Sequence, residues 1–348
     1  MKINTYLMKS NKNNIFIPLC LAAFALVAIL AACDRNEAEA EQRTDGPETA
    51  YLELDQIGVE GNVLSRATPA TTDVPTTGTI GFFRKEANGY GALKHVKGTW
   101  KESKLKPGNN AWIPDPMIKV GTDDATMGIY YPYDERYNTS NSILLFPGEK
   151  GGPAGGVPDN DLVCERWYKE FQYNSLSSYS KTMHVELQQL YSKLKIELKR
   201  GTGFVGKPEW TNVKITSTNY NDISQGAHYY MFNKHSDVHI EDYGRTGAGA
   251  NGLSIPLKST ITFSGETSTP VELLLIPGSL KGKLTIIITL GGKEMPISID
   301  PATSEFNGEF APGKQYNLTI TVNPTDLEVA SLQTKDWTNV NLTGQSTH

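Results

Sequence analysis

The segment "HSDVHIED" at residues 235–242 holds the densest group of side chains in this sequence that could do chemistry. His235, Asp237, His239 and Glu241 recur with a spacing of two, so in a β-strand all four project from one face. Imidazole and carboxylate groups together suit zinc or another transition metal. However, neighbours two apart on a strand lie about 7 Å apart, too far for all four to share one ion. The pattern is therefore a weak metal site or the polar face of a strand, and we expect no metal and no other cofactor.

Two further motifs resemble ligand-binding loops but lack residues that such loops need. The loop "GEKGGPAGG" at 148–156 has the glycines of a phosphate-binding loop without the Gly-Lys-Ser/Thr ending. The acidic residues at 159–161 begin like a calcium loop but lack its glycine and its closing glutamate. Neither a Gly-x-Ser-x-Gly elbow nor a His-Glu-x-x-His pair occurs. We therefore expect that the protein is not an enzyme.

Composition excludes another class of function. The formal net charge is −5, the pI is about 5.8, and no basic stripe is evident. A chain of this kind is an unsuitable partner for nucleic acid. The sequence has three cysteines. Cys20 and Cys33 lie in the N-terminal region described below, so Cys164 has no second cysteine to pair with. We expect Cys164 to be a buried structural thiol and the fold to depend on its hydrophobic core.

The elements that would position any site begin after an N-terminal targeting region. Lys2, Lys9 and Lys12 precede an apolar run at 15–32, which ends in small residues. This order is typical of a secretory signal peptide at 1–32, although the run is long enough for a retained membrane-spanning helix to remain an alternative.

The sequence "LAAC" at 30–33 resembles the lipobox of bacterial lipoproteins. The resemblance implies that Cys33 becomes the new N-terminus and carries acyl chains such as palmitate, which would anchor the precursor in the outer membrane. An acidic stretch at 34–41 follows directly and resembles the surface-export signal of Bacteroidetes lipoproteins. Its alternative interpretation is a solvated linker with no role in sorting.

Alternating apolar and polar residues indicate an all-β protein. In "QYNLTITVN" at 315–323, for example, every second residue is apolar, and "LGGKEM" supplies a hairpin turn. Short strands separated by turn signals favour a β-sandwich or barrel, and helical patterns do not alternate with them as a parallel βαβ sheet requires. Residues 193–199 read as a strand, whereas the stretch before them fits either a strand or a helical turn. We interpret 65–79 as a loop. The predicted strands are 51–60, 79–85, 112–120, 128–135, 142–147, 193–199, 212–220, 253–263, 271–278, 283–292, 294–300 and 315–323.

Several motifs occur in one order along the chain and resemble the fimbrillin-like lipoproteins of Bacteroidales, which are subunits of the type V pilus. They are the lipobox, "SRAT" at 65–68, "GIYYPYD" at 128–134, "LYSKLKIEL" at 190–198, "LLLIPG" at 273–278 and "FAPGKQYNLTITVNPTDLEVASLQTKDW" at 310–337. The resemblance implies two transthyretin-like β-sandwich domains in tandem. With the boundary near residue 202, where "GTGFVGKPEW" interrupts the strands, these domains cover 67–202 and 203–348.

The resemblance also implies a mechanism of assembly. A protease of the outer membrane cuts after an arginine, removes the tether and first strand at 33–66, and opens a groove for a strand from another subunit. Arg66, with Ala67 after it, fits this cut because it follows a weak strand and lies in a predicted loop. Arg43 is the alternative.

The incoming strand should come from the C-terminal part of another chain. One candidate segment carries Leu327, Val329 and Leu332, and the other is the tail 337–342, which begins with Trp337. Alternatively, these residues complete the sheet of their own domain. Head-to-tail donation does not close on itself, so it produces a filament of identical or different pilin subunits.

The expected location is therefore the outer membrane for the precursor and a cell-surface pilus for the assembled subunit, with host proteins or glycans as partners in adhesion. Whether the subunit would form the stalk, the tip or the anchor stays open. The alternative function is a monomeric surface-anchored adhesin or glycan-binding lipoprotein.

Overall fold

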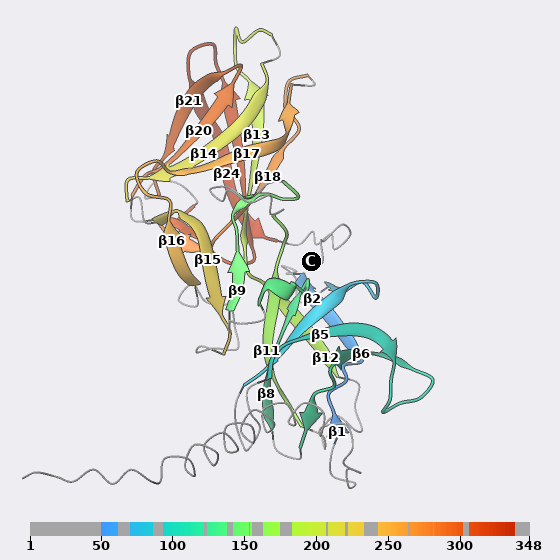
Figure 1. Cartoon of the computed structure of the whole chain (residues 1–348). Coiled ribbons are helices and arrows are strands. Elements are labelled where there is room, and N and C mark those ends of the chain that lie inside the picture. Colours follow the sequence, from blue (N-terminus) through green and yellow to red (C-terminus); the bar gives the residue numbers. More distant parts are fainter. Residues whose placement is uncertain are drawn as a thin grey trace, which may run out of the picture. The chain divides into compact units, whose positions relative to one another are not determined.

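The computed structural model shows an all-β protein (Figure 1), which confirms the predicted fold class. Its described residues are 50–61, 70–85, 93–121, 124–137, 142–152, 154, 163–174, 183–206, 208–219, 222–232, 243–263, 265–280, 282–301 and 306–337. These ranges include a 3₁₀ turn, η2 (Glu135–Tyr137). This part of the chain holds no helix with the length and apolar character needed to cross a membrane.

The first half of the described chain builds an eight-stranded sheet. Its neighbouring strands are antiparallel except for one pair, β2 and β12, which run parallel. The apolar residues of these strands share a hydrophobic core that includes Trp112 and Trp167. In order across the sheet, the strands are β3 (Ala70–Asp73), β2 (Gln56–Gly61), β12 (His184–Gln189), β11 (Trp167–Tyr173), β8 (Ala125–Tyr131), β4 (Thr79–Arg84), β5 (Leu93–Glu102) and β6 (Asn110–Asp115).

A β-sandwich of two further sheets encloses a second core. The alternation of residues along the strands produces this core. In strand β20, for example, buried and half-buried positions alternate, which places Ile286 and Ile288 inside. The hairpin after β20 turns at Gly291 and Gly292, whose positive φ angles of 55° and 80° suit glycine. The five-stranded sheet has the order β10 (Gly148–Glu149), β18 (Val271–Leu275), β13 (Ser192–Arg200), β23 (Lys314–Val322) and β24 (Leu327–Asp336), and the four-stranded sheet has the order β17 (Leu253–Ile261), β14 (Trp210–Ser217), β20 (Leu284–Leu290) and β21 (Lys293–Ile299).

A third core cluster contains side chains from both halves of the sequence, including Tyr130, Tyr191 and Leu274. A buried ion pair lies near it, in which Arg166 Nη2 is 2.9 Å from Asp134 Oδ2. Cys164 is buried, as predicted, and burial raises the pKa of its thiol. The three small sheets that complete the fold are β16 (Tyr243–Gly247), β15 (Ser224–Tyr230) and β9 (Ser142–Leu145); β19 (Gly278–Ser279) with β22 (Glu309–Phe310); and β1 (Ala50–Tyr51) with β7 (Lys119–Val120).

Some expectations about the elements were incomplete. The predicted loop 65–79 contains the short strand β3, the predicted loop at 148–156 contains the short strand β10, and strands β5, β11, β15, β16 and β22 were not predicted as such. The stretch before residue 193 forms strand β12 rather than a helical turn. Strand β13 pairs with β18 and β23, both of which come after residue 202. Residues Thr49–His348 form one compact unit, so the tandem domains and their boundary near 202 stay predictions.

Candidate functional site

Residues 50–61, here the N-terminal segment, are built into the core of the protein. The side chains of Leu52, Leu54, Ile57 and Val59 are each at most 1% exposed. They are spaced two, three and two residues apart, because a bend at Asp55 separates residues 50–54 from strand β2. Four fully buried aliphatic side chains make this segment a large contributor to stability, since each stabilises the fold by roughly 1.5–3 kcal/mol.

The backbone of the N-terminal segment is bonded along most of its length. Strand β2 pairs in parallel with β12 and antiparallel with β3, so it lies between them. Before β2, the amide of Leu52 donates to Ile118 O at 2.9 Å, and Leu54 and Trp112 exchange two backbone bonds of 3.1 and 2.9 Å. Strand β3 has β2 as its only sheet partner among the described strands. The segment therefore joins parts of the sheet that do not otherwise pair.

A buried carboxylate fixes the N-terminal segment to a loop. Glu53 is 7% exposed, and its carboxylate accepts hydrogen bonds from Ser103 Oγ at 2.5 Å, from the amide of Lys104 at 2.9 Å and from the amide of Leu105 at 3.4 Å. Ser103 Oγ in turn accepts a bond of 2.7 Å from the amide of Lys106. Residues 103–106, here the carboxylate-binding loop, belong to the connection between β5 and β6 and hold several donors ready for one carboxylate.

A second carboxylate of the N-terminal segment binds the same loop. Asp55 forms an ion pair of 2.9 Å with Lys106 Nζ and accepts a 2.9 Å bond from the amide of Met183. Both side chains of the ion pair are partly exposed, so this pair stabilises the segment less than the hydrogen bonds of Glu53 do. Together the two acids fix the position of the segment relative to the carboxylate-binding loop and Met183.

The C-terminal strand β24 contrasts with the N-terminal segment. It lies at the edge of the five-stranded sheet, where β23 is its only partner in the described sheets. Leu327, Val329 and Leu332 are half-buried and pack against the sandwich core, and Ala330 forms a bulge. The first candidate donor residues thus complete the chain's own sheet in this structure, as the alternative interpretation described.

Trp337, where the second candidate donor begins, is buried in the third core cluster. Its ring lies 4.2 Å from Lys193 Nζ, and its amide donates a 3.0 Å bond to Gly313 O. Burial lowers the pKa of Lys193, and the nearby carboxylate of Glu272 acts in the opposite direction. The rest of that candidate, residues 338–342, lies outside the described residues.

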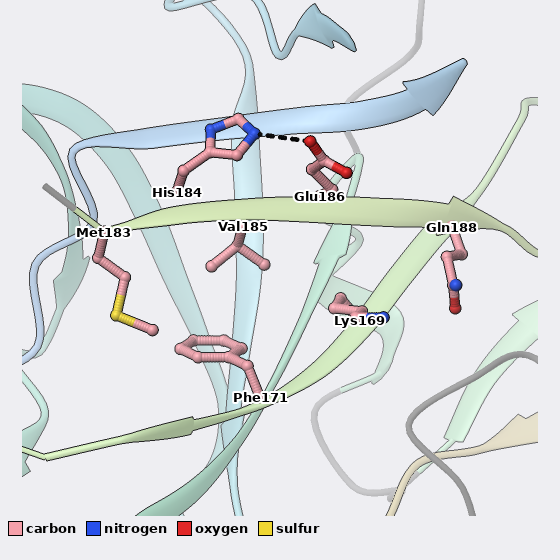
Figure 2. Close-up of a pocket in the computed structure, with 7 residues that line it drawn as sticks. All are labelled: Lys169, Phe171, Met183, His184, Val185, Glu186 and Gln188. Carbon is pink, nitrogen blue, oxygen red and sulfur yellow. Dashed lines mark hydrogen bonds and ion pairs between the residues drawn. The ribbon is translucent and has the colours of Figure 1, made fainter. Parts of the chain in front are cut away.

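A cleft of about 350 Å³ opens on the eight-stranded sheet between β11 and β12 (Figure 2). These strands pair at only two positions, so their other ends diverge. The lining is mixed, with Phe171 and Met183 beside polar groups, and His184 Nε2 lies 3.3 Å from Glu186 Oε1. Met183 also accepts a backbone bond from Gln56, which connects this cleft to the N-terminal segment. The remaining lining residues are Lys169, Val185 and Gln188.

The other predicted site residues lie outside the described part of the chain. These are Cys33 for lipid, Arg43, Arg66 and Ala67 for cleavage, and the set His235, Asp237, His239 and Glu241 for metal. Among the residues that the structure describes, no group of three or more His, Cys, Asp or Glu could hold a metal ion. Sequence reasoning missed Glu53 and Ser103, although a glutamate between two leucines in "LEL" at 52–54 was a weak sign of a fixed carboxylate.

Comparisons with known proteins agree on one group. A family model described as fimbrillin-like matches residues 107–337, whereas no curated protein matches the chain. Three solved structures share low identity with it. One, described in terms of cell adhesion, comes from Bacteroides uniformis (15% identity, 83% of this chain and 99% of that chain, TM-score 0.49). The others are two Porphyromonas gingivalis proteins. One is the tip fimbrial protein Mfa3 (9% identity, 82% of this chain and 100% of that chain, TM-score 0.39). The other is the fimbrial anchor protein Mfa2 (11% identity, 83% of this chain and 98% of that chain, TM-score 0.40).

Proposed function

Because this chain belongs to the fimbrillin-like family, we propose that it is a structural pilus subunit that is exported as a lipoprotein, trimmed after an arginine and assembled by donor-strand exchange. Membership supports a pilus or adhesin-like subunit at the cell surface. The lipobox at Cys33 supports the outer-membrane precursor, and the absence of catalytic motifs in the sequence supports a role without chemistry.

One observation carries the exchange step: the N-terminal segment is a core element that a single cut can detach. Arg66 lies between β2 and β3 in the sequence, so cleavage there separates β1 and β2 from the rest of the sheet. Release of the segment then removes Leu52, Leu54, Ile57 and Val59 from the core and leaves backbone groups of β3 and β12 without partners. An extended chain that supplies both apolar side chains and backbone bonds is the natural replacement.

Assembly then follows from geometry. A donor strand from a second chain fills the groove of the first, and the groove of the second accepts a strand from a third. This contact is heterologous and does not close, so the product is a filament. Subunits of the same kind or of different kinds can take part, provided that the donor fits the groove.

The test is a comparison of two arginine variants of the full-length precursor. After treatment with an arginine-specific protease, wild-type chains and the Arg43→Ala control should form a ladder of polymers on a gel under mild detergent. Arg66→Ala should stay uncut at this site and monomeric. Normal polymers from Arg66→Ala would remove this residue from the mechanism, and monomers from the cut wild-type chain would contradict strand exchange.

The cleft between β11 and β12 supports a second function, that of a monomeric adhesin which binds host protein or glycan. Phe171 supplies an aromatic surface there, and Gln188 and Glu186 supply polar groups that could orient a ligand. A glycan array on the uncut chain tests this function. Binding that disappears in Phe171→Ala, together with failure of the cut chain to polymerise, would favour it over the pilus.

A further inference from the structure

The N-terminal segment and strand β24 share a sequence pattern at a constant offset of 275 residues. Leu52, Glu53 and Leu54 correspond to Leu327, Glu328 and Val329, and Ile57 corresponds to Leu332. In both segments one irregular residue separates the second apolar position from the third. It is the bend at Asp55 in one and the bulge at Ala330 in the other.

The glutamates at the matching position have different surroundings. Glu53 is buried and accepts three hydrogen bonds from the carboxylate-binding loop, whereas Glu328 is exposed on the edge strand. Two of the loop's donors are backbone amides, and they stay in place whichever chain supplies the carboxylate. When the N-terminal segment leaves, these two amides lose the carboxylate that accepts their hydrogen bonds.

We infer that the carboxylate-binding loop is a selection site that admits an incoming strand by its acidic residue, and that its ligand is Glu328 of a second copy of this chain. The inference rests on the proposed function, because it needs a vacated groove. In this register the half-buried Leu327, Val329 and Leu332 enter positions that are fully buried, so the same side chains are better covered in the acceptor than at their own edge. Residues 327–334 include no proline, so each can donate to the neighbouring strand.

The register also explains why cleavage precedes exchange. Ala330 stands where the N-terminal segment has Asp55, so the donor cannot form the ion pair with Lys106. Gln333 and Thr334 replace Gly58 and Val59. The donor is therefore an imperfect copy that binds less well than the chain's own strand. Exchange becomes favourable once a cut has turned the own strand into a separate fragment that can diffuse away.

The alternative register places the tail in the groove. There Asp336 would take the place of Glu53, and Trp337, Val340 and Leu342 would take the places of Leu54, Ile57 and Val59. This register is disfavoured because it puts Lys335 at the position of Leu52, which is fully buried, and a tryptophan at the position of a leucine.

The experiment measures capture of a fluorescent peptide with the sequence of residues 325–336 by the full chain after it has been cut at Arg66. The wild-type peptide should bind the cut chain and not the uncut chain. The Glu328→Gln peptide, which keeps shape and loses charge, should bind at least about tenfold more weakly, as expected for loss of charge-assisted hydrogen bonds. The Asp336→Asn peptide is the matched control and should bind like wild type. In a Ser103→Ala chain, the difference in binding between the wild-type peptide and the Glu328→Gln peptide should shrink.

Other outcomes separate this inference from the proposed function. Equal binding of the wild-type and Glu328→Gln peptides would overturn the inference, as would weakened binding of the Asp336→Asn peptide alone or no capture of the wild-type peptide. If the cut full-length chains still polymerise in any of these cases, strand exchange stands and only the role of Glu328 fails. If they do not polymerise, the proposed function fails as well.

Discussion

The N-terminal segment and strand β24 carry nearly the same apolar pattern, yet they occupy opposite environments. In the first, every apolar side chain of the pattern is fully buried and the glutamate is bonded to a loop. In the second, the apolar side chains are half-buried and the glutamate faces solvent. The difference shows that such a pattern specifies a strand with one apolar face, while the neighbouring strands decide how deeply that face is buried.

Substitution of matching apolar residues should produce the largest contrast. Leu54→Ala removes a fully buried side chain, so we expect the free energy of unfolding of the uncut chain to fall by about 2–5 kcal/mol. Val329→Ala acts on a half-buried side chain at a sheet edge and should cost about 1 kcal/mol. Chemical denaturation of both variants measures the difference. Equal losses would mean that β24 is as firmly held as the N-terminal segment and is a poor candidate to leave its sheet.

The matching glutamates should give the next largest contrast. Glu53→Gln weakens three hydrogen bonds in a buried place, and we expect a loss of about 1–3 kcal/mol in the uncut chain. Glu328→Gln should leave the unfolding midpoint of the uncut chain unchanged, because this glutamate is exposed. A clear loss in Glu328→Gln would show that this carboxylate already has a structural role in its own sheet.

Loss of the ion pair between Asp55 and Lys106, which β24 cannot form in the same register, should have the smallest effect on the free energy of unfolding. In Asp55→Asn the charge opposite Lys106 is lost from a partly exposed site, so we expect a loss of about 0.5–1 kcal/mol. After cleavage at Arg66, the same variant should release its N-terminal fragment faster, which size-exclusion chromatography can follow. An unchanged release rate would mean that the ion pair does not delay exchange.

The fold class could be predicted from the sequence because alternation is a local signal. Strands such as β20 and β23 show it clearly, and burial of Cys164 was expected because its sequence neighbours form no catalytic signature and no other cysteine is left to pair with it. Strand partners were not predictable, because pairing depends on residues far apart in the chain. Thus β13 joins strands from the second half of the sequence, and β3 was hidden in a stretch rich in proline and threonine.

The site was predictable only in outline. A weak strand upstream of Arg66 indicated a removable element, but nothing local indicated that Glu53 would meet a loop fifty residues away.

The parallel pairing of β2 with β12 has a consequence for the order of events during folding. Asp55 and Met183, which bond at this junction, are separated by 128 residues, and contacts of such separation form late because they close a long loop. The segment that leaves the ribosome among the first of the described residues is thus among the last to dock. In the proposed mechanism, a chain whose N-terminal segment has not yet docked displays the same opening that cleavage later creates, and docking of the segment would prevent premature pairing between newly made chains.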